Sequence, residues 1–173
     1  MATVSPEASN RLNEIFPCGG ASRWITRERP KIDRIACPWL VLRFVDPSAE
    51  FLFVPANEVL SRSREVGAEP FDIPGVRFSH RGERCSFDAF LKEFALEADT
   101  ALAHLATIVR GADTAALDLA PEAPGLLAVS LGLSQIYSDD QEMLRAGMVV
   151  YDALYAWALG AQGERHGWPP TMS

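Results

Sequence analysis

The sequence contains few cysteines and no long apolar segment. Its three cysteines, Cys18, Cys37 and Cys85, are an odd number spread over 173 residues, which excludes a disulfide scaffold and is typical of a reducing compartment. No apolar run reaches the roughly 18 residues that cross a bilayer, and residues 1–16 lack the basic and apolar segments of a secretory signal. We therefore expect a cytoplasmic protein that makes no membrane contact.

The sequence is also short of positive charge. Its 16 Lys and Arg residues are outnumbered by 23 Asp and Glu residues, which gives a formal net charge of −7. Unaided binding to nucleic acid depends on Lys and Arg that neutralise phosphates, so we expect no direct nucleic-acid contact. A Ser-His-Asp order, a glycine-rich phosphate loop and a dinucleotide fingerprint are all missing, so familiar motifs leave open whether the protein is an enzyme.

What is present is the composition of one globular domain, with 48% hydrophobic and 23% charged residues. Short strand-like segments precede a series of helical ones. We predict an α+β fold, in which a small N-terminal sheet of three or four short strands packs with a predominantly helical C-terminal half. The strands are expected at 24–26, 50–54, 70–73 and 76–79. The predicted divisions are an N-terminal arm (1–21), the domain (22–160) and a polar tail (161–173).

Capping residues predict the ends of the later helices. Thr100 begins a helix that Gly111 ends, and Asp113 or Thr114 could cap a following turn. Ser138 is followed three positions later by Gln141, which is the pattern of a capping box at the start of the longest helix.

The segment from Lys31 to Asp46 is almost entirely apolar after its first residues, so we expect a buried helix at the centre of the core. Pro38 fits the first turn of a helix, which predicts that the helix begins there with Cys37 at or near its N-cap and Trp39 buried. A helix N-terminus favours the thiolate form of a cysteine, and thiolates bind metals and attack electrophiles. The alternative is that Cys37 is a small buried core residue.

A second informative segment runs from His80 to Asp88. Cys85 directly precedes Ser86, a capping residue, so it also lies at a predicted helix start, and His80 is close to it in the chain. Thiolates and imidazole suit a transition metal such as zinc or iron. The His-x₄-Cys spacing is weakly specific, and a polar surface loop is the alternative explanation.

Charged residues near these segments could complete a site. Asp33 and Asp113 could coordinate a metal or orient an imidazole, although an ion pair and a helix cap explain them as well. Arg34 and Arg110 could hold an oxyanion, because a guanidinium group offers forked donors to such ions.

Six segments resemble the ChrB-type chromate resistance domain in the same order along the chain. They are Lys31–Leu40, Phe51–Pro55, Pro70–Gly75, His80–Phe87, Ile108–Thr114 and Tyr151–Trp157. The resemblance implies a role in chromate resistance, as a chromate-responsive regulator or as an accessory protein beside an efflux transporter. Longer family members carry a further N-terminal region thought to bind DNA, whereas a short arm precedes the domain here, which argues against direct transcriptional regulation.

Three hypotheses follow. The first is a binding module with Cys37, His80, Cys85 and Asp113 as metal ligands. In it, Asp33, Arg34 and Arg110 bind an oxyanion or orient the ligands, and the partner is a small inorganic ion. The second is a thiol-dependent enzyme in which Cys37 and His80 reduce chromate or carry out related redox chemistry. The third is a structural or interaction domain with buried core cysteines. A homodimer is compatible with each.

Overall fold

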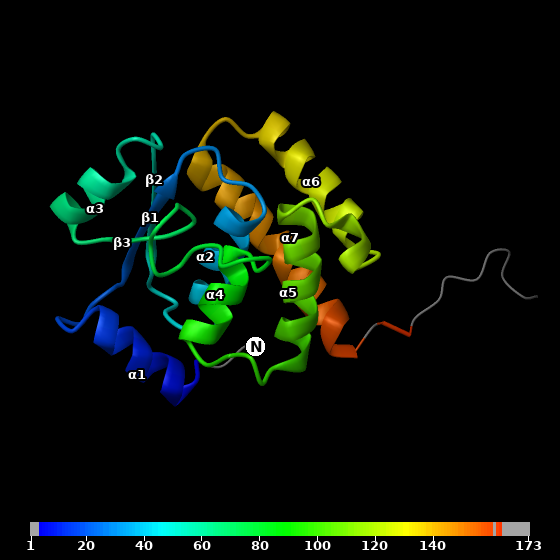
Figure 1. Ribbon diagram of the computed structural model, residues 1–173, viewed down its shortest axis with the longest axis horizontal. Coiled ribbons are helices and arrows are strands. Elements are labelled where there is room, and N and C mark those ends of the chain that lie inside the picture. The colour runs from blue at the N-terminus through cyan, green and yellow to red at the C-terminus, as the bar shows by residue number, and fades with distance from the viewer. Residues whose placement is uncertain (1–3, 161, 164–173) are drawn as a thin grey trace, which may run out of the picture.

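The computed structural model describes residues 4–160, 162 and 163, and it has the predicted α+β architecture (Figure 1). A small parallel sheet lies at one side of the molecule and helices form the rest. The strands are β1 (Arg23–Arg27), β2 (Glu50–Val54) and β3 (Glu69–Pro70). The helices are α1 (Pro6–Ile15), α2 (Asp33–Phe44), α3 (Val59–Val66), α4 (Ser86–Glu93), α5 (Thr100–Asp113), α6 (Ala123–Ile136) and α7 (Asp140–Gly160), with a 3-10 turn at Leu117–Leu119.

The sheet has the strand order β2-β1-β3, and both pairings are parallel. Alternate residues of β1 point to opposite faces: Trp24 packs in the main core with α2 and α4, whereas Ile25 packs with Val59 of α3. The two connections, through α2 and through α3, therefore cover opposite faces of the sheet, as Figure 1 shows. The first connection leads from β1 to β2 on one side of β1, and the second leads from β2 to β3 on the other side of β1. The strand order therefore reverses at β1.

The predicted fourth strand, 76–79, does not form. In the part of the chain that the structure describes, this segment makes a single bridge between Phe71 and Phe78. Phe78 is fully buried against Trp24 and Phe90, with ring centroids 5.1 and 4.5 Å away. The aromatic side chain holds the segment against the core, so it does not extend along the edge of the sheet.

Helix α2 occupies the centre of the core, as predicted, and Trp39 is only 1% exposed. The predicted start of the helix is wrong. The helix begins at Asp33, one turn before Pro38, and Cys37 lies inside it and not at its N-cap. Pro38 is the sixth residue of α2, so its missing N–H removes one backbone hydrogen bond from inside the helix.

Two further predicted helix ends are corrected by the structure. Helix α5 continues through Gly111 and includes Asp113 as its last residue. Gly111 is required for packing, because a Cβ atom there would lie 2.9 Å from the Cβ of Ala123. At the start of α7 the cap is Asp139, whose carboxylate accepts from the Glu142 N–H at 2.8 Å, and Ser138 precedes it.

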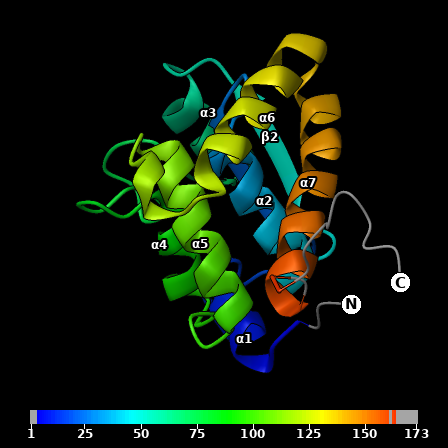
Figure 2. The same cartoon turned by 90° about the vertical axis from the view of Figure 1, so that its right-hand side faces the viewer.

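The remaining helices enclose this centre. Ala8 of α1 is fully buried in the core, although α1 belongs to the predicted N-terminal arm. Helix α6 lies on the outside of the helical half, beside α5 and α7 (Figure 2). Among the described residues no helix is both long and apolar enough to cross a membrane. The predicted polar tail lies outside the described residues except for Gln162 and Gly163.

Candidate metal centre

The candidate site lies at the carboxyl edge of the sheet. β1 ends at Arg27 and β3 ends at Pro70, and because the strands are parallel these ends meet at one edge. In open α/β sheets, ligands bind outside the carboxyl ends of the strands where the strand order reverses. Asp33, the first residue of α2, and Asp72, two positions after β3, both lie in this region.

Three chain segments meet there around the imidazole of His80. The Nε2 atom of His80 lies 3.1 Å from Asp113 Oδ2, 3.4 Å from Asp72 Oδ1 and 3.5 Å from Asp33 Oδ2. One ligand atom from each of Asp33, His80 and Asp113 lies within 4.8 Å of the others. We call these three residues together with Asp72 the carboxylate–histidine cluster.

Asp33 is the most deeply buried member of the cluster, with 1% of its surface exposed. Its Oδ2 atom accepts from the backbone N–H of Ser86, at the start of α4, and also faces His80. Its Oδ1 atom has no hydrogen-bond partner among the described residues. An unpartnered carboxylate oxygen is costly to bury, which marks this atom as one that a ligand could satisfy.

Asp72 is held by three side chains. Its Oδ1 atom accepts from the Ser86 hydroxyl at 2.8 Å, and its Oδ2 atom lies 2.8 Å from Arg27 Nη2 and 3.3 Å from Arg34 Nε. Asp72 has a φ of +52°, a left-handed conformation that aspartate tolerates better than most residues. The two arginines and the serine therefore fix the orientation of this carboxylate beside His80.

The backbone that leads into Asp33 is also held in an unusual conformation. Ile32 has a φ of +44°, which is strongly unfavourable for a β-branched residue. The hydroxyl of Tyr151 on α7 donates to the Ile32 carbonyl at 3.0 Å. Backbone strain of this kind costs on the order of 1–3 kcal/mol and occurs often at functional sites, so it fits a role in placing Asp33.

The electrostatic environment shifts the titration of the cluster. The hydrogen bond to Asp33 and the surrounding carboxylates raise the pKa of His80 to about 9. Burial, together with repulsion from Asp33 and Asp72, raises the pKa of Asp113 to about 7. Burial also raises the pKa of Asp33. The repulsion between the carboxylates is a concentration of negative charge that a bound cation would relieve.

The two cysteines of the predicted site are not members of this group of ligand atoms. Cys37 and Cys85 are both fully buried. Burial and the nearby carboxylates raise the pKa of each thiol, so the expected stabilisation of thiolates at helix starts is wrong. For Cys37 the helix position is also wrong, whereas Cys85 does lie at the N-cap of α4. At Cys85 desolvation outweighs the effect of the helix end.

The two predicted oxyanion-binding arginines have partners within the protein. Arg34 contacts Asp72 and donates to the backbone carbonyls of Arg27 and Glu28. Arg110 makes two parallel hydrogen bonds to Asp88, at 2.9 and 2.8 Å, and Asp88 in turn accepts from the backbone N–H at the start of α4. Arg34 thus supports the cluster through Asp72, whereas Arg110 contacts Asp88.

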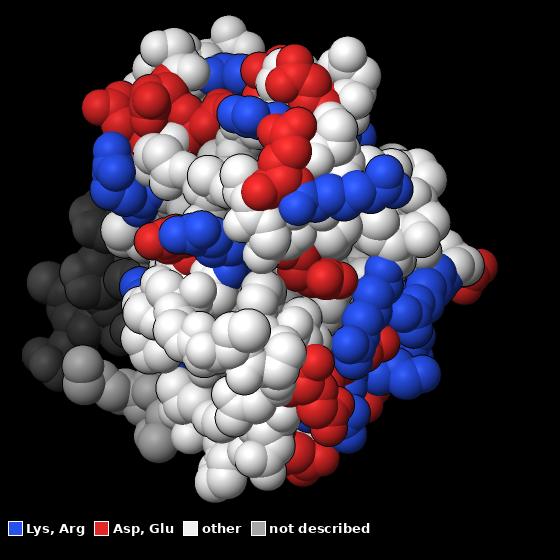
Figure 3. Space-filling model, turned by 90° about the vertical axis from the view of Figure 1, so that its left-hand side faces the viewer, with Lys and Arg blue, Asp and Glu red and all other residues white. Residues whose placement is uncertain are grey.

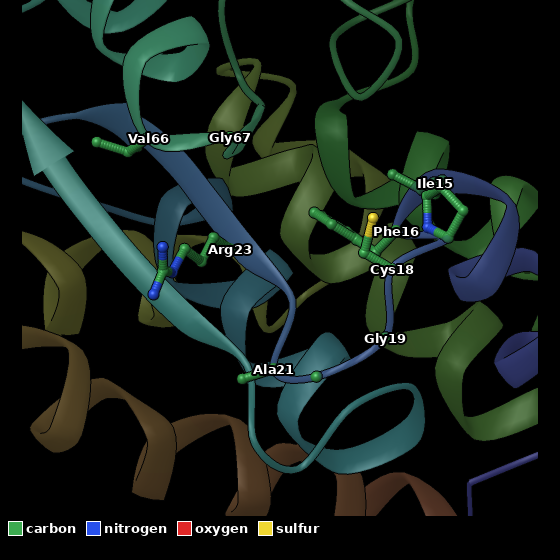
Figure 4. A pocket seen from close by; sticks show the side chains of 10 residues that line it. Ile15, Phe16, Cys18, Gly19, Ala21, Arg23, Val66 and Gly67 are labelled. Carbon is green, nitrogen blue, oxygen red and sulfur yellow. The ribbon is translucent and has the colours of Figure 1, made fainter.

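The exposed thiol, Cys18, lies elsewhere, beside a hollow of about 470 Å³ between the end of α1 and the end of α3. Figure 4 shows that the Arg23 side chain points away from the Cys18 thiol. Arg23 is ion-paired with Glu50 at 2.9 Å. The hollow therefore brings no second reactive group to the sulfur.

The left-hand face of the molecule in Figure 1 carries acidic and basic side chains interspersed with one another (Figure 3). In α3, Arg62 and Glu65 form an ion pair at 3.0 Å. The expectation that the chain makes no direct nucleic-acid contact stays a prediction.

Sequence reasoning named His80, Asp33 and Asp113 but missed Asp72. It placed Asp72 inside a strand at 70–73, whereas β3 ends at Pro70. A signal was available: a carboxylate directly after a strand lies at the ligand-binding edge if the strands are parallel. The parallel pairing, however, depends on the long-range order of the strands, which the local sequence pattern does not reveal.

Comparison with known proteins identifies the family. The family model described as "ChrB, C-terminal domain" matches residues 24–158. The protein ChrB of Cupriavidus metallidurans is 37% identical over 133 residues, a match that covers 77% of this chain and 40% of that protein. The chain thus corresponds to about two fifths of the length of this curated relative. No solved structure gives a significant match. The chain belongs to the family of the ChrB C-terminal domain.

Proposed function

We propose that this chain acts in chromate resistance as a cytoplasmic module that binds a divalent transition metal ion through Asp33, His80 and Asp113. The role in chromate resistance is supported by membership of the ChrB C-terminal domain family. The cytoplasmic location is supported by the three cysteines, which are all free.

The observation that carries the proposal is the unpartnered oxygen of Asp33. A carboxylate that is 1% exposed keeps its Oδ1 atom without a hydrogen bond while its Oδ2 atom faces His80. Bringing Asp113 and Asp72 to the same imidazole adds further negative charge. Clustered carboxylates require positive charge, which the protonated His80 supplies in the metal-free protein and which a bound metal ion would supply in its place.

The donor set indicates the kind of metal. Two carboxylates and one imidazole suit borderline divalent ions such as zinc or ferrous iron, because no thiolate contributes to the group. Three protein ligands also leave a coordination position open, which is typical of sites that act on or bind a second molecule. Asp72, fixed by Arg27 and Arg34, would orient His80 from the side.

No observation favours the thiol-dependent enzyme. A thiol that attacks a substrate must be accessible and partly ionised. Cys37 and Cys85 are fully buried, and burial raises the pKa of both.

The test is zinc titration of the metal-free protein by calorimetry, in a Cys18→Ser background because the exposed thiol could itself bind zinc. We expect one equivalent of tight binding. His80→Ala and Asp113→Asn should each weaken binding at least tenfold, because the loss of even an outer-shell partner costs roughly 10–100-fold in metal affinity. His104→Ala is the matched control, because His104 packs against Trp157 away from the cluster. Absence of stoichiometric binding, or equal losses in H80A and H104A, would refute the proposal.

A further inference from the structure

Helix α6 exposes apolar side chains and buries polar ones. Val129 is 45% exposed and Ile136 is 72% exposed. Ser130 and Ser134, on the inner side of the helix, are only 3% and 8% exposed. The 14 residues of α6 include no charged one, although a surface helix of a globular protein normally turns charged residues toward water. The outer side of α6 (Figure 2) therefore has the composition of a contact surface.

Small and branched residues alternate along this outer side. Because an α-helix turns about 100° per residue, four residues lie within about 60° of one another around its axis: Gly125, Val129, Gly132 and Ile136. We call them the α6 stripe. Among the described residues, nothing lies within 4 Å of a Cβ atom added at either glycine, so α5 and α7 do not need these glycines for packing. Glycine is a poor helix former, and the folded chain by itself gives no reason for two of them here.

The order of residues along the stripe is complementary to itself in an antiparallel arrangement. When two copies of α6 pack at a shallow crossing angle, Gly125 of one protomer faces Ile136 of its partner. Val129 of one protomer then faces Gly132 of its partner. Both pairings have their midpoint between residues 130 and 131, so one twofold axis produces them together. Each branched side chain thus meets a glycine, which lets the two helices approach closely.

Charge also favours a second copy on this side of the molecule. The chain carries a formal net charge of −7, so two copies repel each other in most orientations. They approach with least repulsion through a helix that has no charged residue. A single helix pair about 21 Å long is a small interface, so we expect micromolar affinity and a monomer in dilute solution.

We propose that the α6 stripe binds the α6 stripe of a second copy of this chain, in an antiparallel and twofold-symmetric pair. The inference is independent of the proposed function, because α6 contributes no residue to the carboxylate–histidine cluster. The dimer leaves that cluster within each protomer, so both sites can be tested separately.

The test is sedimentation equilibrium at protein concentrations from about 1 to 300 µM, which bracket the expected Kd of about 1–100 µM. A chelator and a Cys18→Ser background prevent metal ions and the exposed thiol from joining copies. Gly132→Val should weaken dimerisation at least tenfold, because it places valines against each other. Val129→Gly should do the same, because it leaves a gap between two glycines. The double variant V129G/G132V restores the pairing of large with small residues, so its Kd should return to within about threefold of the parent value.

The matched control is Leu131→Gly on the same helix. Leu131 is 46% exposed, like Val129, but lies about a third of a turn from the centre of the stripe, so this variant should dimerise like the parent protein. Circular dichroism checks that each variant is folded. If Val129→Gly unfolds, Gly132→Val decides alone, since its added side chain meets open space in the monomer.

A parent protein that stays monomeric over the whole concentration range would overturn the inference. A dimer that Gly132→Val leaves unchanged, or that Leu131→Gly weakens as much as Val129→Gly does, would place the interface elsewhere and also overturn it. Loss of the dimer in both single variants without recovery in the folded double variant would overturn the antiparallel pairing. None of these results bears on zinc binding, which tests the proposed function.

Discussion

Gly147 of α7 lies directly against Ile35 of α2. A Cβ atom at Gly147 would stand 2.5 Å from the Cγ2 atom of Ile35, which is closer than real side chains approach. Ile35 is 1% exposed and cannot move aside into solvent. The contact brings α7 close to the first turn of α2, where Asp33 begins the helix and Tyr151 binds the Ile32 carbonyl.

We predict that Gly147→Ala destabilises the protein by up to about 2 kcal/mol. Alanine gains about 1 kcal/mol of helix propensity over glycine, but overpacking a core contact costs roughly 1–3 kcal/mol. The measurement is the urea midpoint of unfolding. The matched control is Gly132→Ala in α6, where nothing lies within 4 Å of the added methyl group, so stability should rise by up to about 1 kcal/mol. If Gly147→Ala and Gly132→Ala both raised the stability, the close packing of α2 and α7 would be contradicted.

The stability of the metal-free protein should fall as the pH rises from about 4 to 9. The folded-state pKa of Asp113 is raised from 3.8 to about 7, so its contribution is fully present below about pH 4 and lost through pH 7. The pKa of His80 is raised from 6.5 to about 9, so its contribution is present below 6.5 and lost as the pH passes 9. Urea unfolding in the presence of a chelator at several pH values measures this.

Between pH 7 and 9, the predicted loss of stability comes from the imidazole of His80. His80→Gln should remove the loss of stability between pH 7 and 9, whereas His104→Gln should retain it, since His104 packs on Trp157. A stability that rises between pH 5 and 9 in the parent protein would show that the carboxylates do not surround His80 as described.

The reactivity of the thiols distinguishes the proposed metal-binding function from the thiol-dependent enzyme. We expect one cysteine, Cys18, to react rapidly with an aromatic disulfide reagent at pH 8, because it is exposed. Cys37 and Cys85 should react only after unfolding, because both are fully buried and their pKa values are raised. Rapid modification of either buried thiol in the native protein, with Cys18→Ser as the comparison, would support the thiol-dependent enzyme hypothesis instead.

Local patterns predicted the class of fold and the central helix, because apolar periodicity and burial are properties of short segments. The buried Trp39 follows from the apolar stretch around it. The predictions based on Pro38 and Gly111 gave wrong helix ends, because both residues lie inside their helices in the structure. Gly111 makes room for Ala123, and the sequence alone cannot distinguish this from a helix stop.

The candidate site was predicted only in part, because local patterns do not show which distant segments meet. His80, Asp33 and Asp113 were named from their local positions, but only the fold shows that all three meet and that Asp72 joins them. The cysteines were favoured because helix ends stabilise thiolates, yet desolvation outweighs that effect at a fully buried sulfur. Burial depends on the whole fold, so a rule based on helix ends could not weigh it.

The most direct test of the account is a crystal structure of the zinc-soaked protein with data collected at the zinc absorption edge. The account predicts one strong anomalous peak in the carboxylate–histidine cluster, roughly 2.0–2.2 Å from a ligand atom of each of Asp33, His80 and Asp113. A peak bonded to Cys37 or Cys85, or no peak within reach of His80 at full zinc loading, would contradict it.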